Sequence, residues 1–105
     1  MSSDFSIQID RDGDHAVIVI SGELDLRTRD QLSAAATRTL HDATTVIADL
    51  SRVTFVDSSG LSALVGARRE AERLQRAFLI RSAHGPVARM LEISGLGRWL
   101  AGETT

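Results

Sequence analysis

The stretch Val46–Leu61, with the sequence Val-Ile-Ala-Asp-Leu-Ser-Arg-Val-Thr-Phe-Val-Asp-Ser-Ser-Gly-Leu, predicts a strand, a short connection and the start of a helix. The β-branched, apolar segment Val46–Leu50 is typical of a strand covered on both faces. Asp57, Ser58 and Ser59 can each accept hydrogen bonds from the unpaired N–H groups of a first helical turn. Apolar residues then follow at helical spacing. The pattern therefore places a serine hydroxyl at the positive end of a helix dipole, where a phosphate is well tolerated.

The composition indicates one compact, soluble domain over residues 1–105, of which 43% are hydrophobic and 25% charged. The net charge of -2 disfavours a nucleic-acid partner. The absence of cysteine excludes disulfides, thiolate catalysis and cysteine metal sites. Met1–Asp4 lacks the basic and apolar regions of a signal peptide, and no apolar run approaches membrane-spanning length. We therefore expect a cytoplasmic protein with no membrane partner.

The N-terminal third predicts a β-hairpin. Phe5–Ile9 alternates apolar and polar residues, as a half-exposed strand does. The dipeptide Asp12-Gly13 is typical of a tight turn, and the wholly apolar Ala16–Ile20 predicts a strand inside the sheet. A calcium loop is the alternative reading of the acidic residues around the turn, but Gly13 is misplaced for it and Ser21 occupies the position of its closing Glu.

The next segment, Gly22–Thr28, leads into a first helix. Thr28 with Gln31 three residues later has the form of a capping box, and Asp30 suits the first turn. The residues expected on the buried face of this helix are Leu32, Ala35, Ala36, Thr39 and Leu40.

The second helix is expected over about residues 58–75, with a highly charged far half exposed to solvent. Arg68 and Arg76 each lie four residues from Glu72, within side-chain reach. Gly60 and Gly66 are costly inside a helix, which indicates close approach to the sheet or to a docking partner.

The remaining chain predicts a short strand at residues 77–80, a helix that starts at Pro86 and ends at Gly95, and a short apolar element at residues 96–100. The fold class is therefore α/β, with a mixed four- to five-stranded sheet, an N-terminal hairpin plus parallel strands, and helices covering it.

The motifs give little support for a catalytic, nucleotide-binding or metal-binding site. Asp57-Ser58-Ser59-Gly60 is not a nucleophile elbow, and nothing places His15, His41 or His84 beside Ser58 as a base. Neither a P-loop nor a dinucleotide fingerprint is present, and metal binding has no supporting ligand motif. Taken alone, Asp57-Ser58-Ser59 is explained equally well by helix capping without any further function.

Three segments together resemble the STAS domain family. They are Gly22-Glu23-Leu24-Asp25 followed by Thr28, Phe55–Leu61, and Ile93-Ser94-Gly95-Leu96. The order and spacing match over nearly the whole chain, and the likeness is greatest to the free-standing bacterial anti-sigma factor antagonists.

This resemblance implies a partner switch. An anti-sigma factor antagonist binds an anti-sigma factor and so releases a sigma factor. The anti-sigma factor is usually also a serine kinase that phosphorylates the antagonist, and a phosphatase restores the binding form. The resemblance also implies that the partner supplies ATP and magnesium, so that this chain needs no cofactor and is not an enzyme. We expect a monomer in the free state.

By position in the family motif, the phosphoacceptor is Ser58, with Ser59 as the fallback. Ser62 replaces a frequent glycine, and Leu26-Arg27 stands at a variable position. The residues implied in partner binding are Glu23, Asp25, Thr28, Asp57, Ser58, Ser59, Gly60, Leu61 and Ser62.

Two other functions remain open at this stage. Other STAS domains serve transport or lipid-transfer complexes as accessory subunits. A small-ligand or nucleotide sensor is the third possibility, which titration with GTP and ATP would test.

Overall fold

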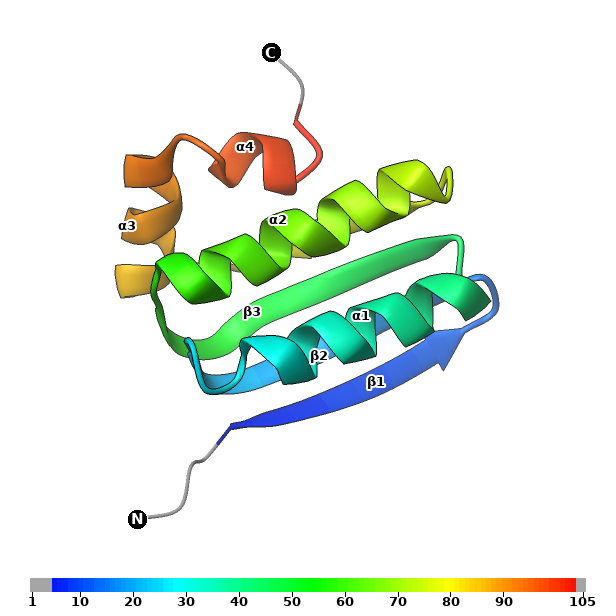
Figure 1. The fold of residues 1–105 in the computed structure, drawn as a ribbon, viewed down its shortest axis with the longest axis horizontal. Helices are drawn as coiled ribbons and strands as arrows, with labels where there is room; N and C mark the ends of the chain where they lie inside the picture. The colour runs from blue at the N-terminus through cyan, green and yellow to red at the C-terminus, as the bar shows by residue number, and fades with distance from the viewer. Residues whose placement is uncertain (1–4, 104–105) are drawn as a thin grey trace.

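The computed structural model describes residues 5–103, and its helices and strands alternate along most of the chain (Figure 1). The elements in order are β1 (Ser6–Asp12), β2 (His15–Leu24), α1 (Arg29–Asp42), β3 (Thr45–Val56), α2 (Ser58–Arg73), β4 (Ala77–Arg81), α3 (Gly85–Ser94) and α4 (Gly97–Leu100).

The four strands form one mixed sheet in the order β1-β2-β3-β4. The strand pair β1–β2 is antiparallel, while β2–β3 and β3–β4 are parallel. The predicted hairpin is confirmed: Asp12 pairs with His15, and Gly13 occupies the first position of the two-residue loop with φ at 61°. The expected fold class is also confirmed, with four strands.

Strand β3 is longer than the sequence pattern indicated. The predicted connection after Leu50 is wrong, because the strand continues to Val56. The register of β3 against β2 shifts twice, between Val19 and Ser21 and again between Gly22 and Glu23 of β2. Such irregularities bend a strand and interrupt its alternation of buried and exposed residues, which is why this part of β3 reads as a connection.

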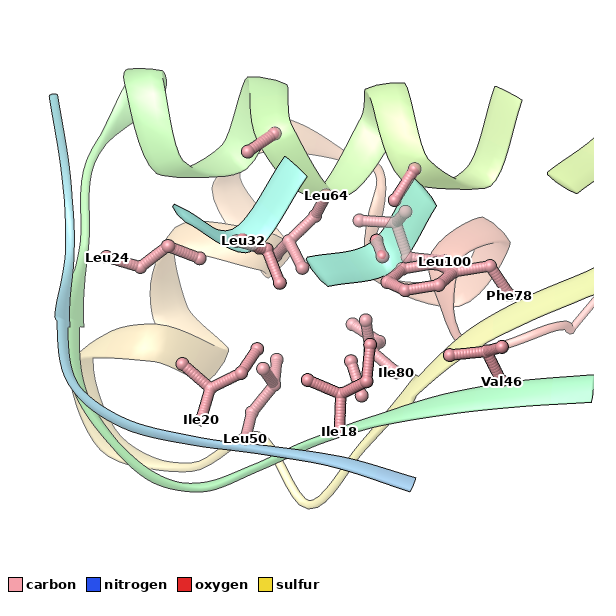
Figure 2. Close-up of a cluster of buried hydrophobic side chains, with 14 of the residues drawn as sticks. Ile18, Ile20, Leu24, Leu32, Val46, Leu50, Leu64, Phe78, Ile80 and Leu100 are labelled. Carbon is pink, nitrogen blue, oxygen red and sulfur yellow. The ribbon is translucent and has the colours of Figure 1, made fainter. Parts of the chain in front are cut away.

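The helices cover one face of the sheet, so the expectation of a strand covered on both faces is wrong. Figure 1 shows α1 and α2 lying side by side across that face. Along β3, Val46, Ala48 and Leu50 are buried, whereas the alternate residues Ile47 and Asp49 are half-buried. Figure 2 shows the core between the sheet and the helices; its largest fully buried side chains are Phe78, Ile18, Ile20, Leu24, Leu32, Leu40, Leu50, Leu64, Leu100, Val46, Val53 and Val87.

Helix α1 buries the face that the sequence predicted, which consists of Leu32, Ala35, Ala36, Thr39 and Leu40. An arginine from the turn after α2 satisfies carbonyl oxygens at the C-terminal end of α1. The guanidinium of Arg76 donates to the carbonyl oxygens of Leu40 at 2.5 Å and Ala43 at 3.1 Å. The expected pairing of Arg76 with Glu72 is therefore wrong. The guanidinium of Arg76 instead donates to carbonyl oxygens at the end of α1 that lack intrahelical partners.

Helix α2 ends at Arg73, two residues before the expected end, and Gln75 has a left-handed φ of 58°. The predicted Arg68–Glu72 pair is present at 3.4 Å. However, the Arg68 side chain is only 15% exposed, because it stacks on the Trp99 ring and donates to the Trp99 carbonyl oxygen. The expectation that the charged half of α2 is wholly exposed to solvent is thus wrong for Arg68. This side chain binds the C-terminal segment to the helix.

Helix α3 has Pro86 in its first turn and ends at Gly95, whose φ is 76°, as predicted. It packs against β3, and its buried residues are Val87 and Leu91. Among residues 5–103, no helix combines the length and apolar character needed to cross a membrane.

Candidate functional site

The candidate site lies where the neighbouring parallel strands β2 and β3 reach their carboxyl ends. Leu24 and Val56 are partners in the register, and the N–H of Asp57 donates to the carbonyl oxygen of Leu24 at 3.2 Å. The segment after β2 and the first turn of α2 are therefore neighbours, as Figure 1 shows at the end where α2 begins. Residues that are about 30 positions apart in the sequence meet there.

Gly60 makes this approach possible. A Cβ on Gly60 would lie 2.2 Å from the Leu24 carbonyl oxygen, closer than real side chains come. The expectation that Gly60 serves close approach to the sheet is confirmed. The same expectation for Gly66 is wrong as regards the sheet, since a Cβ there would meet no atom of the described chain within 4 Å.

Asp57 starts helix α2. Its backbone is extended, and its carboxylate accepts a hydrogen bond from the N–H of Gly60 at 2.9 Å. Its carbonyl oxygen accepts from the N–H of Leu61 at 2.8 Å. This is the geometry of an N-cap, which the sequence predicted, and it occupies one of the unpaired donors of the first turn.

The two serines that follow differ in accessibility: Ser58 is exposed and Ser59 is half-buried. Within residues 5–103, neither hydroxyl forms a hydrogen bond with another group of the chain. The N–H groups of Ser58 and Ser59 point out of the first turn as donors that α2 itself does not use. A negatively charged group on the Ser58 oxygen would meet these donors and the positive end of the helix dipole.

The loop after β2 is held by Thr28, whose hydroxyl is the centre of a small hydrogen-bond network. Thr28 Oγ1 donates to the carbonyl oxygen of Glu23 at 2.8 Å and accepts from the N–H of Asp25 at 3.0 Å. The predicted capping box is wrong: Thr28 is the N-cap residue of α1, but its side chain caps nothing in that helix. The hydroxyl faces the preceding loop instead, where two backbone groups need partners.

Asp25 is turned inward in the same network, with 14% of its side chain exposed. Its carboxylate accepts from the Arg27 N–H at 2.9 Å and pairs with the Arg27 guanidinium at 3.3 Å. Burial opposes ionisation of Asp25, but these Arg27 bonds and the Thr28 hydroxyl outweigh it and lower the pKa of the carboxyl. The Asp25 carboxylate is therefore ionised, and its hydrogen bonds hold the loop in place.

The other residues expected to bind a partner are partly exposed and partly packed against the core. Glu23 and Ser62 are exposed, Ser62 one helical turn after Ser58, and Glu23 pairs with Arg27 at 3.6 Å. Leu61 is half-buried and packs against the core. The structure thus brings the exposed Glu23, Ser58 and Ser62 to one end of the sheet, with Thr28 and Gly60 buried beneath them.

Sequence reasoning missed two exposed apolar residues at this end, Leu26 and Phe55. A signal for Phe55 was present, because Phe55 and Val56 are consecutive in a strand and must point to opposite faces. With helices on one face only, one of the two has to be exposed. Leu26 left no comparable signal.

The catalytic alternative finds no support in the placement of the histidines. The Nε2 of His84 lies 2.7 Å from the carbonyl oxygen of Ser51. His15 begins β2 and His41 lies in the last turn of α1. In the part of the chain that the structure describes, no hydrogen bond joins a histidine to Ser58, and no cluster of three or more potential metal ligands occurs.

Comparison with known proteins decides the family. The family model described as Mlab, STAS domain matches residues 7–102. The chain belongs to the STAS domain family. An anti-sigma-B factor antagonist of Listeria monocytogenes is 31% identical to this STAS domain over 93 residues, which are 87% of the chain and 82% of that protein.

Solved structures give the same result for this STAS domain. The unphosphorylated anti-sigma factor antagonist SpoIIAA superposes with a TM-score of 0.78 at 28% identity, over 95% of this chain and 89% of that one. The phosphorylated form of SpoIIAA, a Bacillus cell fate determinant, gives a TM-score of 0.71 at 27% identity, over 95% and 92%. The chain therefore resembles one antagonist in both its phosphorylation states.

Proposed function

We propose that this STAS domain is an anti-sigma factor antagonist whose binding is switched off by phosphorylation of Ser58. The observation that carries the proposal is the exposed Ser58 hydroxyl on the first turn of α2, next to a capping Asp57. The relatives named anti-sigma factor antagonists support the partner class. A kinase domain of that partner supplies ATP and magnesium, so the chain acts as substrate and regulator rather than as an enzyme.

The fold tolerates the phosphate for a local reason. Phosphoserine carries about -1.5 to -2 charges at neutral pH. At Ser58 this charge meets the free N–H groups and the dipole of the first turn of α2, which stabilise an anion. The unphosphorylated and phosphorylated domains therefore share one fold.

The docking surface does not tolerate the same phosphate. Ser58 lies beside Asp57 and close to the loop that carries Glu23 and Asp25, so an added dianion increases repulsion within an already acidic region. A partner that desolvates this region also has to strip water from the phosphate. A phosphatase that removes the group restores binding. Ser59 is the weaker acceptor because its side chain is half-buried.

The roles of the remaining positions follow from their accessibility. Glu23, Ser58 and Ser62 are exposed and face the partner. Asp25, Thr28 and Gly60 act beneath them by holding the loop and the helix start together. Asp57 and Leu61 fix the first turn of α2.

The test is the affinity of purified wild type, Ser58→Asp and Thr37→Asp for each anti-sigma factor kinase encoded in the source genome. Thr37 is exposed on α1 and provides a matched added charge away from the site. We expect at least one kinase to bind wild type and Thr37→Asp equally, and to bind Ser58→Asp about 100-fold or more weakly, a loss of roughly 3 kcal/mol. Equal binding of Ser58→Asp would contradict the switch, and no binding of wild type would contradict the partner class.

A further inference from the structure

Three large apolar side chains are exposed within residues 5–103, and two of them lie at the end of the sheet where α2 begins. Leu26 is 63% exposed and Phe55 is 45% exposed. Each is two residues from the hydrogen bond that joins the Asp57 N–H to the Leu24 carbonyl oxygen, and Ser58 is one residue from it. Both side chains therefore lie at the edge of the sheet that carries Ser58, with Phe55 on the face that the helices leave uncovered.

Neither apolar side chain serves the core. The partly buried hydrophobic residues that pack against the core include Leu61 but neither Leu26 nor Phe55. Leu26 projects from a loop that is already fixed by the bonds of Asp25 and Thr28, so its exposure is held in place. Exposed large apolar residues at a binding surface are typical of interface anchors.

The surroundings of these two residues are acidic. Glu23 is the register partner of Phe55, and Asp25 precedes Leu26. With Asp57, three carboxylates stand against two guanidinium groups: Arg27, which already pairs with Glu23 and Asp25, and the exposed Arg52, which lies beside Phe55 in the register, so the region keeps an excess of negative charge. At the start of α1, Arg29 pairs with Asp30 at 3.8 Å and leaves this balance unchanged. Charge complementarity therefore requires a basic partner surface.

We infer that Leu26 and Phe55 are the apolar anchors of the docking surface, and that the anti-sigma factor receives them in a hydrophobic groove bordered by Arg or Lys side chains. This inference rests on the proposed function and adds the chemistry of the partner's surface. Different residues provide the affinity and its regulation. The two anchors supply contact area, while phosphorylated Ser58 supplies the negative charge that weakens binding.

The experiment measures the affinity of Leu26→Ser and Phe55→Ser for the anti-sigma factor that binds wild type. Truncating an anchor at an interface weakens binding by roughly tenfold or more. Ile93→Ser is the matched control, because Ile93 is 76% exposed and lies on α3, outside the segment after β2 and the first turn of α2. Urea unfolding of each variant checks that the fold is unchanged.

We expect weaker binding for Leu26→Ser and for Phe55→Ser, wild-type binding for Ile93→Ser, and tighter binding for Arg27→Gln, which removes the cation that pairs with Glu23 and Asp25. The role of Leu26 and Phe55 as anchors would be contradicted if Leu26→Ser and Phe55→Ser bound within twofold of wild type, or if Ile93→Ser were equally impaired. Weaker binding of Arg27→Gln would overturn the basic partner surface. These results leave the proposed function standing, whereas it fails if wild type itself binds no anti-sigma factor.

Discussion

The backbone of Gly60 packs directly against Leu24: a Cβ on Gly60 would lie 2.2 Å from the Leu24 carbonyl oxygen, 2.8 Å from its carbonyl carbon and 2.9 Å from its Cγ. The first turn of α2 can sit this close to the end of β2 only because residue 60 has no side chain. The Asp57–Leu24 hydrogen bond and the position of Ser58 both depend on that approach.

Gly60→Ala should destabilise the domain by about 1–3 kcal/mol, because the inserted methyl group forces the helix away from backbone atoms that cannot move aside. Gly66→Ala in the same helix is the control. Its Cβ meets open space, so the change should stabilise the domain by about 0.5–1 kcal/mol through helix propensity. Urea unfolding measures both; equal effects of the two substitutions would contradict the close approach.

Asp57→Ala should cost about 0.5–2 kcal/mol of stability, because the N–H of Gly60 loses its only cap. Asp57→Asn keeps an oxygen acceptor of the same shape and should stay close to wild type. The free energy of unfolding is the readout. Loss of the same size in both variants would show that the charge of Asp57, not its capping bond, stabilises the helix.

Asp49 should make stability fall with acid. The hydrogen bond from the Ser51 N–H lowers the pKa of Asp49; burial opposes this, and Arg81 adds to the lowering. A carboxyl whose pKa is lowered by folding contributes stability that is complete above its unfolded pKa of about 4 and is lost as the pH falls through the folded value. The affected range is therefore below about pH 4.

Unfolding measured from pH 6 to pH 3 tests this effect, since Asp49→Asn should lose less stability over that range than wild type. Asp30→Asn, at an exposed position on α1, corrects for the loss of one negative charge. Parallel curves for wild type and Asp49→Asn would refute the prediction.

Arg68→Ala should loosen the C-terminal segment, because Arg68 lies 4.9 Å from the Trp99 ring and also bonds the Trp99 carbonyl oxygen. Trp99 is the single tryptophan, so its fluorescence reports this segment alone. We expect a red-shifted emission and a loss of about 0.5–2 kcal/mol, the range of a cation–π contact. Arg69→Ala, at the exposed neighbouring position, should leave the emission unchanged.

Local patterns predicted much of this fold. The alternation in Phe5–Ile9, the Asp12-Gly13 turn and the buried face of α1 each depend on residues close in sequence, and each is confirmed. The cap at Asp57 is local as well. Propensity, turn chemistry and capping suffice in such cases, because the partners lie within four residues of one another.

The errors arose where hydrogen-bond partners outside a helix compete with partners inside it. Thr28 caps no helix because the Glu23 carbonyl and the Asp25 N–H are better placed partners in the folded loop. Arg76 leaves Glu72 for the end of α1, which is distant in sequence. The exposure of Phe55 depends on which face of the sheet the helices cover, and the sequence pattern alone does not determine that face.

The most direct test of the account is to phosphorylate the protein with its anti-sigma factor kinase and Mg-ATP, locate the phosphate by mass spectrometry, and compare the affinities of the modified and unmodified forms for that kinase. We predict a single phosphate on Ser58, none on the Ser58→Ala variant, and binding weakened about 100-fold or more with the thermal unfolding of the domain nearly unchanged. A phosphate on Ser59 instead, or a Ser58-phosphorylated protein that binds as tightly as the unmodified one, would contradict it.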